Sequence, residues 1–455
     1  MRDDEHPPTP DAAQSVVPHV LAIALLLLIG SALRLHRLEE LPPRLSADEY
    51  TTALDVFAIA HGGGPPLFGL DWKPMPALTA HASAALIGVT GPTIFGLRAL
   101  SIGLSLLAGV LLFVLLRQQC AGAVAWSAAL LLLANPWFLN FSRSNWENAH
   151  VGAYWLLFSL CALRALQARR GATAWAGGAG LALALSLYGY FSGRLLLVAW
   201  ALYAPLAVAI AGWRRAAVVY AVVLATAAAL FAPQVPVIAR DWEHFQQRVA
   251  NVSVLNADPA AHGFAPGTTR LGMAAGQLAT TLHYLVVGAP LGKVHYGPPD
   301  RPPYHWLLVP LLLLGLGRSL QRWREGAWYA VLFFVVLIAT QGLSVDAPDL
   351  GRLAGAAPLC FWFIGYGADG LLRRVPTERR RLAAAGVVAG ALLLSGLEWR
   401  AFTAWMADPG VANARGGGVD YRDYPDWQAM QYSRLAAGQP PISVIEWEAL
   451  QEQHR

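Results

Sequence analysis

The chain has 455 residues, of which 56% are hydrophobic and only 13% are charged, and its mean hydropathy is +0.43. This exceeds the apolar content that the core of a soluble protein needs, so the composition indicates a polytopic membrane protein. The formal net charge of +5 comes almost wholly from arginines at the ends of hydrophobic segments, which is typical of membrane orientation signals and argues against nucleic acid as a partner.

The hydrophobic segments predict an all-α integral membrane protein. Residues 1–15 are acidic and rich in proline, so they are predicted to be a disordered cytoplasmic leader. Residues 16–405 are predicted to form the transmembrane domain, because they contain segments close to the ~20 residues that span a bilayer. About eleven crossings are expected, at residues 16–35, 94–116, 121–139, 149–166, 174–192, 195–212, 216–238, 304–320, 327–344, 353–372 and 382–405.

Two further apolar stretches, 76–91 and 270–290, are predicted to be juxtamembrane helices. They are short or interrupted by polar residues, and they fall in the two large loops 36–93 and 240–303. With the predicted crossings, most of the arginine-rich loops fall on one side of the membrane and the two large loops fall on the other. The arginine-rich loops are therefore predicted to be cytoplasmic, and the large loops are predicted to lie on the outer face. Residues 406–455 are expected to form a short non-cytoplasmic tail or cap.

The sequence indicates no metal site and no cofactor. Cys120, Cys161 and Cys360 lie in or beside hydrophobic segments without a CxxC or Cys/His spacing, which points to neither zinc nor a disulfide framework. Motifs for nucleotide phosphates, nucleophile elbows and zinc proteases are absent from the sequence. A requirement for a divalent cation stays open.

An adjacent pair of acids, Asp48 and Glu49, opens an amphipathic run in the first outer loop. A carboxylate beside a low-dielectric interface has a raised pKa, which suits a general base. The alternative is that the acids only start a surface helix, since Ser46 and Asp48 both suit an N-cap.

Basic residues on the same predicted face could bind a phosphate. Lys73 is the only lysine of the first loop, and its alternative role is an anchor to lipid headgroups. Arg143, Arg194 and Arg352 each follow a turn on the outer side and could jointly neutralise a phosphate or diphosphate, although a single arginine there could simply snorkel.

The order of these features resembles the bacterial members of glycosyltransferase family 39, of the GT-C fold class, which includes protein O-mannosyltransferases and the lipid A aminoarabinose transferase. The resemblance rests on Arg37-Leu38-Glu39-Glu40-Leu41-Pro42-Pro43 leading to Asp48-Glu49, on Lys73-Pro74 and Leu97-Arg98-Ala99-Leu100-Ser101, on Asn135-Pro136 through Phe141-Ser142-Arg143, and on Leu185-Ser186-Leu187-Tyr188-Gly189-Tyr190 before Arg194. It spans roughly residues 16–373, and the family's usual Lys-Pro-Pro is Lys-Pro-Met here.

The resemblance implies a GT-C bundle, a polyprenyl-phosphate sugar donor and an acceptor hydroxyl on a protein, a lipid or a glycan. Asp48 would be the general base and Glu49 its helper, while Lys73, Arg143 and Arg194 would hold the lipid phosphate. His61, Tyr190 and His283 are further candidates for contacts with the acceptor or the sugar. We therefore expect a multi-pass glycosyltransferase among the lipids of the plasma membrane, with its active site on the periplasmic or extracellular side. The alternatives are a transporter or flippase of lipid-linked sugars and a non-catalytic membrane assembly protein.

Overall fold

A computed structural model of the protein describes residues 16–42, 44–168, 170–322, 327–415, 419, 423–440, 442 and 444–453. The predicted leader, 1–15, lies outside the described residues. Within the described residues the regular structure is helical, apart from two isolated β-bridges that join Leu70 to Pro76 and Ser253 to Ser344. The predicted all-helical class is confirmed.

Six helical segments are long and apolar enough to cross a membrane. A seventh crossing is possible if α5 and α6, which meet at a bend of 61°, form one broken span. The bend lies at Pro136, which has no N–H to continue the helix, and the Asn135 side chain accepts the N–H of Phe138 instead. The segments are α1 (Val16–Leu35), α4 (Ile94–Arg117), the pair α5 (Gly122–Ala134) and α6 (Pro136–Ser142), α7 (Asn148–Gln167), the 3-10 turn Phe191–Arg194 with α9 (Leu195–Ala211), α10 (Trp213–Phe231) continued through Ala232–Gln234 and α11 (Val235–Arg240), and α17 (Thr377–Met406).

Four shorter helices complete the bundle, and each of the eleven predicted hydrophobic segments coincides with helix. They are α8 (Ala172–Tyr188), α14 (Val309–Gln321) with the 3-10 turn Trp306–Leu308 before it, α15 (Trp328–Gly342), and α16 (Ala357–Leu372) after the 3-10 turn Ala354–Ala356. Because only six or seven of the described segments reach full spanning length, the count of eleven crossings stays a prediction.

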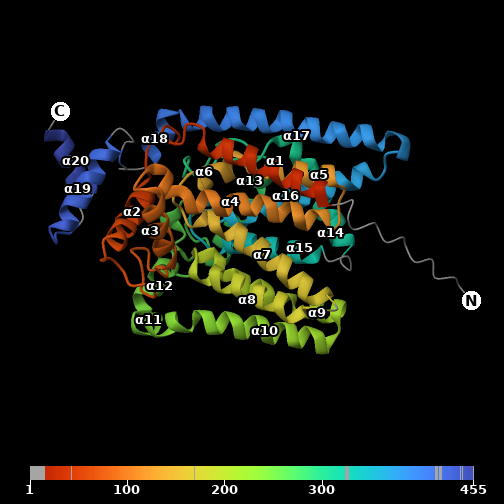
Figure 1. The fold of residues 1–455 in the computed structure, drawn as a ribbon, viewed down its shortest axis with the longest axis horizontal. Helices are drawn as coiled ribbons and strands as arrows, with labels where there is room; N and C mark the ends of the chain where they lie inside the picture. The colour runs from red at the N-terminus through yellow and green to blue at the C-terminus, as the bar shows by residue number, and fades with distance from the viewer. Residues whose placement is uncertain are drawn as a thin grey trace, which may run out of the picture.

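The remaining helices belong to the large loops and the C-terminal tail. Figure 1 shows α2, α3, α12 and α18 to α20 gathered at the left end of the bundle, the end opposite the turn between α16 and α17. The stretches 76–91 and 270–290 form helices, as predicted. The bounds are α2 (Ala47–Ala60), α3 (Leu78–Thr90), α12 (Trp242–Val252), the 3-10 turn Ala260–His262, α13 (Arg270–Val286), α18 (Pro409–Ala414), α19 (Tyr424–Ala436) and α20 (Val444–Gln453).

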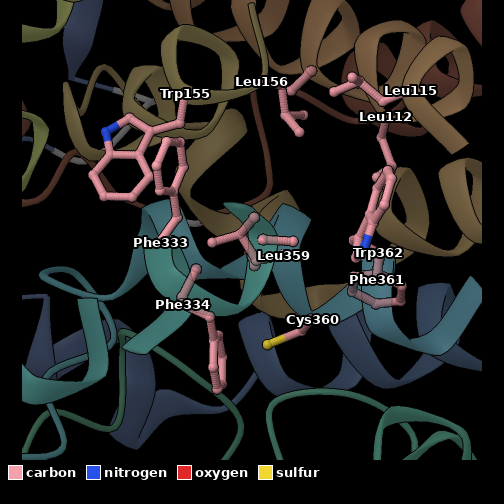
Figure 2. Close-up of a cluster of buried hydrophobic side chains, with 14 of the residues drawn as sticks. Leu112, Leu115, Trp155, Leu156, Phe333, Phe334, Leu359, Cys360, Phe361 and Trp362 are labelled. Atoms are coloured by element: carbon pink, nitrogen blue, oxygen red, sulfur yellow. The ribbon is translucent and has the colours of Figure 1, made fainter. Parts of the chain in front are cut away.

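A dense aromatic and aliphatic core joins α4, α7, α15 and α16 (Figure 2). The rings of Trp155 and Phe333 meet edge to face, with centroids 5.1 Å apart. Cys360 lies in the same core, and it and the other two cysteines are free thiols. Such packing fixes the helices that carry the loops at the left end.

The C-terminal segment packs against α2. Trp427 of α19 donates to the Tyr50 hydroxyl at 2.9 Å, and that hydroxyl donates to the carbonyl of Ile442, also at 2.9 Å. Residues of α2, α3, α4, α19 and α20 share one apolar cluster. The start of α2 is therefore held between the bundle and the tail.

Candidate active site

The acidic pair lies in the first turn of α2, and its two members face different surroundings. Ser46 is the N-cap: its hydroxyl accepts the N–H of Glu49 at 3.1 Å, and the Glu49 carboxylate accepts the N–H of Ser46 at 3.2 Å. This reciprocal capping box satisfies the helix start without Asp48. The carboxylate of Asp48 is left available, and 40% of its side chain is exposed.

A tight loop brings Lys73 to Asp48. The Asp71 carboxylate accepts the backbone N–H groups of Lys73 at 2.9 Å and Met75 at 3.0 Å, which closes the loop around Pro74. The loop is docked on α2, because the backbone N–H of Trp72 donates to Asp55 at 3.2 Å. The side chain of Lys73 is thus presented by a preformed turn rather than by a free strand.

Lys73 lies between two carboxylates. Its Nζ is 3.6 Å from an oxygen of Asp48 and 3.5 Å from an oxygen of Glu147, and the side chains of Lys73 and Glu147 are only 10% and 4% exposed. Burial alone would lower the pKa of Lys73, but the negative charges of Glu147 and Asp48 outweigh it and raise that pKa above its usual value. Lys73 is therefore a permanent cation at this position.

The buried surroundings of Asp71 shift its pKa. Burial and the negative charge of Glu147 raise its pKa to about 7, although the N–H groups of Met75 and Lys73 act in the opposite direction. Asp71 can therefore exchange a proton near neutral pH, whereas the neighbouring Lys73 stays protonated.

A polar cavity of about 250 Å³ opens at this cluster. Its wall is formed on one side by the start of α2 and the Lys73 loop, and on the other side by α12. The lining residues are Asp48, Trp72, Lys73, Pro74, Gln247 and Asn251.

A second, largely apolar cavity of about 310 Å³ lies against the other face of α12. Tyr190, which interacts electrostatically with Lys73, and Arg352 both line it. Arg352 is bound to Asp349 at 3.4 Å and to the carbonyl of Val345 at 2.8 Å, and Lys293 also contacts Asp349 at 2.8 Å. Burial opposes ionisation of Asp349, but Arg352 and Lys293 hold its pKa below the usual value.

Arg194 lines neither cavity, but it neighbours Ser192 and Leu195, which line the apolar one. Its guanidinium packs against the rings of Phe191, at 4.7 Å, and Phe245 of α12, at 4.2 Å, and it interacts with the charge of Asp71. Its Nη2 is buried and has no hydrogen-bond partner among the described residues. A buried, unpaired donor of this kind is suited to an anionic ligand.

Glu49 was predicted at the catalytic centre beside Asp48, but its surroundings are structural. Its carboxylate is fully buried and is bound by Arg98 at 2.9 and 3.2 Å and by Arg415 at 2.9 Å. The N–H of Asn145 adds a bond at 3.0 Å. Burial would raise the pKa of Glu49, but the two arginines hold it below its usual value. These contacts are those of a buried anion that joins α2, α4 and the tail, and a catalytic role of Glu49 stays a prediction.

Arg143 was predicted to hold the lipid phosphate, but its guanidinium is fully buried and faces backbone. It donates to carbonyl oxygens in the last turn of α1 and just after its end, at distances of 2.7 to 3.3 Å. The last carbonyls of a helix have no partner within the helix, so an arginine is a natural cap for them. These acceptors are Leu33, Arg34, His36, Arg37 and Leu41.

Two predicted contact residues lie away from both cavities. His61 ends α2, about 20 Å from Asp48 along the helix at 1.5 Å per residue, and its ring meets that of Tyr432. His283 is exposed on α13 and lines neither cavity. Of the predicted residues, the structure brings Asp48 and Lys73 together, with Tyr190, Arg194 and Arg352 close by.

Glu147 and Asp71 were not predicted, although the sequence contains a signal for one of them. Glu147 is the single acidic residue between Asp71 and Asp241, and it lies in a turn between hydrophobic helices. A lone carboxylate in such a position usually has a function or a buried partner. Among the described residues, no group of three or more acidic, histidine or cysteine side chains is arranged to bind a metal ion.

The comparisons with known proteins agree with the fold. The sequence model of the family described as dolichyl-phosphate-mannose-protein mannosyltransferase matches residues 71–236, which include Lys73, Glu147 and Arg194 but not Asp48. No curated protein matches the chain by sequence.

Two solved structures illustrate the structural similarity. ArnT from Cupriavidus metallidurans bound to undecaprenyl phosphate has a TM-score of 0.54 at 13% identity, over 89% of this chain and 78% of that one. The oligosaccharyltransferase AglB from Archaeoglobus fulgidus, in complex with an inhibitory peptide and a dolichol-phosphate, has a TM-score of 0.58 at 14% identity, over 91% and 58%. At these identities the likeness shows the fold, and the resemblance to the GT-C glycosyltransferases is confirmed at that level.

Proposed function

We propose that this chain, whose fold is that of the GT-C membrane glycosyltransferases, transfers a sugar from a polyprenyl-phosphate donor to an acceptor hydroxyl, with Asp48 as the general base. The observation that carries the proposal is the pairing of a partly exposed carboxylate with a buried, permanently charged lysine at one polar cavity. The apolar cavity beside it, which contains Arg352, is suited to the lipid part of such a donor.

The chemical step needs a base and positive charge. Asp48 accepts the proton of the acceptor hydroxyl as its oxygen attacks the anomeric carbon, and the bond from that carbon to the phosphate oxygen breaks with inversion. The lipid phosphate leaves as an anion, so no further acid is required. Preorganised cations aimed at the leaving phosphate lower the barrier because they do not have to reorganise during the reaction.

Lys73 and Arg194 are the cations that we assign to this phosphate. Glu147 contacts Lys73 at 3.5 Å in addition to Asp48, so Glu147 keeps the ammonium in place when the phosphate competes with Asp48 for it. Arg194 offers an unpaired buried N–H, while Arg352 is anchored by Asp349 at the apolar cavity. Tyr190 lines the same cavity and is a candidate contact with the sugar or the lipid.

The charge pattern of the loops favours an active site on the outer face of the plasma membrane. The acceptor is a protein, a lipid or a glycan. A transporter or flippase would place its charged residues near the middle of the spans. Here Asp48, Lys73, Asp71 and Glu147 lie in loops or at helix starts, which favours transfer over translocation.

The direct test is transfer of a radiolabelled sugar from polyprenyl-phosphate donors by the purified protein. We expect Asp48→Asn to lower the rate by roughly 10²- to 10⁴-fold, the usual contribution of a general base, while the protein stays folded. Lys73→Gln should raise the KM for the donor as well. Glu40→Gln is the matched control, because Glu40 is an exposed carboxylate in the same loop and, among the described residues, pairs only with Arg37.

Full activity of the Asp48→Asn protein would contradict the role of Asp48 as the general base. Movement of a fluorescent lipid-linked sugar across proteoliposomes, without any transfer, would favour the flippase alternative. Labelling of a cysteine at position 48 only from the cytoplasmic side would contradict the proposed topology.

A further inference from the structure

One wall of the polar cavity has no part in the proposed reaction. It is formed by α12, which contributes Gln247 and Asn251, whereas Asp48 and Lys73 lie on the wall formed by α2 and the loop docked on it. The two amide side chains are four residues apart, so they lie on the same face of the helix. Because both line the cavity, that face of α12 is turned toward the candidate catalytic groups.

Another face of the same helix is apolar. Phe245, Val249 and Val252 have the i, i+4, i+7 spacing of a single helical face. Val249 and Val252 line the apolar cavity, and the ring of Phe245 packs on the guanidinium of Arg194 at 4.2 Å. One helix therefore separates the polar cavity from the apolar one.

Backbone hydrogen bonds at the C-terminal end of α12 fix the orientation of these two faces. The N–H of Val345 donates to the carbonyl of Val252 at 2.8 Å, and the N–H of Val254 donates to the carbonyl of Leu343 at 3.0 Å. These bonds join the end of the helix to the segment that follows α15, which belongs to the bundle. The amide face is thus positioned by main-chain contacts rather than by side chains.

The two amides are available to a ligand. Both side chains are exposed, and neither Gln247 nor Asn251 has a hydrogen-bond partner among the described residues. An amide both donates and accepts, so it can exchange hydrogen bonds in both directions with a hydroxyl group, which does the same. A carboxylate only accepts and an ammonium only donates, so either would use half of each amide. The chemistry of this wall therefore matches an uncharged ligand that carries hydroxyl groups.

Trp72 gives the same cavity an apolar surface. It is 37% exposed, and its indole N–H donates to the hydroxyl of Thr52 at 3.3 Å, which holds the ring in place. A sugar has hydroxyl groups at the edge of its ring and C–H groups on its faces, so it can contact amides and an indole together. The volume of about 250 Å³ is below the ~300–1,000 Å³ of pockets for drug-sized ligands, which suits one sugar ring.

We propose that Gln247 and Asn251 recognise the hydroxyl groups of the sugar on the donor, and that this sugar is a single uncharged unit. The sugar faces the two amides at the polar cavity, and the lipid lies against Val249 and Val252 in the apolar one. This inference rests on the proposed function, because it takes a polyprenyl-phosphate sugar as the donor. It assigns the choice of sugar to α12, whereas Asp48 and Lys73 serve the transfer step.

The experiment measures binding of donor lipids to the purified full chain in detergent, so that no acceptor is needed. The ligands are radiolabelled polyprenyl phosphate without a sugar and the same lipid linked to glucose, mannose, galactose, glucuronic acid or glucosamine. We expect at least one neutral-sugar lipid to bind more tightly than the bare lipid phosphate. The double variant Q247A/N251A should weaken binding of that lipid roughly thirtyfold, about the contribution of two neutral hydrogen bonds. Its affinity for the bare lipid phosphate should change by no more than about twofold.

The matched control is Q246A. It removes the same side chain from the neighbouring position of α12, which is exposed and lines neither cavity. We expect its affinities for all the lipids to equal those of the unchanged protein. Should the double variant not fold, the single variants Q247A and N251A, each with a loss of roughly fivefold, provide the same test.

Four results would overturn the inference. These are unchanged binding of the neutral-sugar lipid by Q247A/N251A, equal weakening of the bare lipid phosphate, the same loss in Q246A, and tighter binding of the glucuronic acid or glucosamine lipid than of every neutral one. Failure of the proposed function has a different signature. A protein that shows the sugar-dependent binding but transfers no sugar contradicts the transfer and supports recognition by α12. A protein that transfers sugar and keeps its donor preference in Q247A/N251A contradicts only the inference.

Discussion

Replacing Glu49 by glutamine should unfold the protein more readily rather than remove a catalytic group. The carboxylate accepts bonds from Arg98, Arg415 and the backbone of Ser46 and Asn145, and none of it is exposed. Glutamine keeps the shape but turns one oxygen into a donor that faces arginine. Two buried guanidinium groups then lose their counter-ion.

The magnitude follows from this geometry. Removing one partner of a buried ion pair costs about 3–5 kcal/mol, because the other charge stays buried and uncompensated. That is a large part of the 5–15 kcal/mol that typically separates folded from unfolded protein. Asp48→Asn, at a partly exposed position with one ion pair at 3.6 Å, should cost only about 0.5 kcal/mol.

The assay compares the two variants in one detergent, by the fraction of monodisperse protein that survives heating and by the transfer rate of the protein that remains folded. Glu49→Gln should lose its fold at a clearly lower temperature, and Asp48→Asn should lose transfer at an unchanged temperature. Combining Glu49→Gln with Arg415→Gln should cost less than the sum of the single changes, because the two groups share one interaction. A Glu49→Gln protein with normal thermal survival and no transfer would refute the reasoning and return Glu49 to the catalytic centre.

Three further predictions concern the charges around the site. The pKa of Asp71 is raised to about 7 in the folded protein and is close to 4 in the unfolded chain. The protonated side chain therefore stabilises the fold fully below about pH 4, and this stabilisation is lost as the pH rises through 7. Asp71→Asn should flatten this part of a stability profile measured between about pH 4 and 8, and an unchanged slope would contradict the prediction. Arg143→Gln should lower the free energy of unfolding by about 3 kcal/mol or more, since several buried carbonyls lose their donor, and should leave the donor KM of the folded fraction unchanged in steady-state assays. Arg194→Gln should do the reverse, raising the donor KM roughly tenfold with little change in thermal survival; a variant with normal KM would remove Arg194 from the phosphate site.

The helices were predictable because a bilayer demands long apolar segments, and a segment such as 94–116 can satisfy that demand only as a helix. The capping box at Ser46 and Glu49 was visible as a local pattern. The ion pair between Glu49 and Arg415 could not be predicted from the sequence, because Arg415 lies 366 positions further along the chain. No periodicity or motif reports a pairing over that distance.

The surroundings of Arg143 could not be predicted from the sequence for a related reason. Its place at the end of a hydrophobic helix is typical both of an arginine that meets phosphate and of one that caps another helix, and only the packing of α1 beside α6 decides between them. Its guanidinium already donates hydrogen bonds to backbone carbonyl oxygens in the absence of any ligand. Glu147, by contrast, was available to sequence reasoning as the one acid in a long stretch without any other.

The two lysines of the chain, Lys73 and Lys293, form ion pairs at the two cavities. Lys73 contacts Asp48 and Glu147 at the polar cavity, and Lys293 contacts Asp349, the partner of Arg352, at the apolar one. The buried structural cations, Arg34, Arg98, Arg143 and Arg415, are all arginines, whose fixed forks suit permanent bonds to carbonyls and carboxylates. A compact ammonium can move between carboxylate and phosphate with little geometric cost. In a chain whose permanently charged basic side chains, apart from the two lysines, are arginines, Lys73 therefore occurs where the proposed reaction requires a cation to exchange a carboxylate partner for a phosphate.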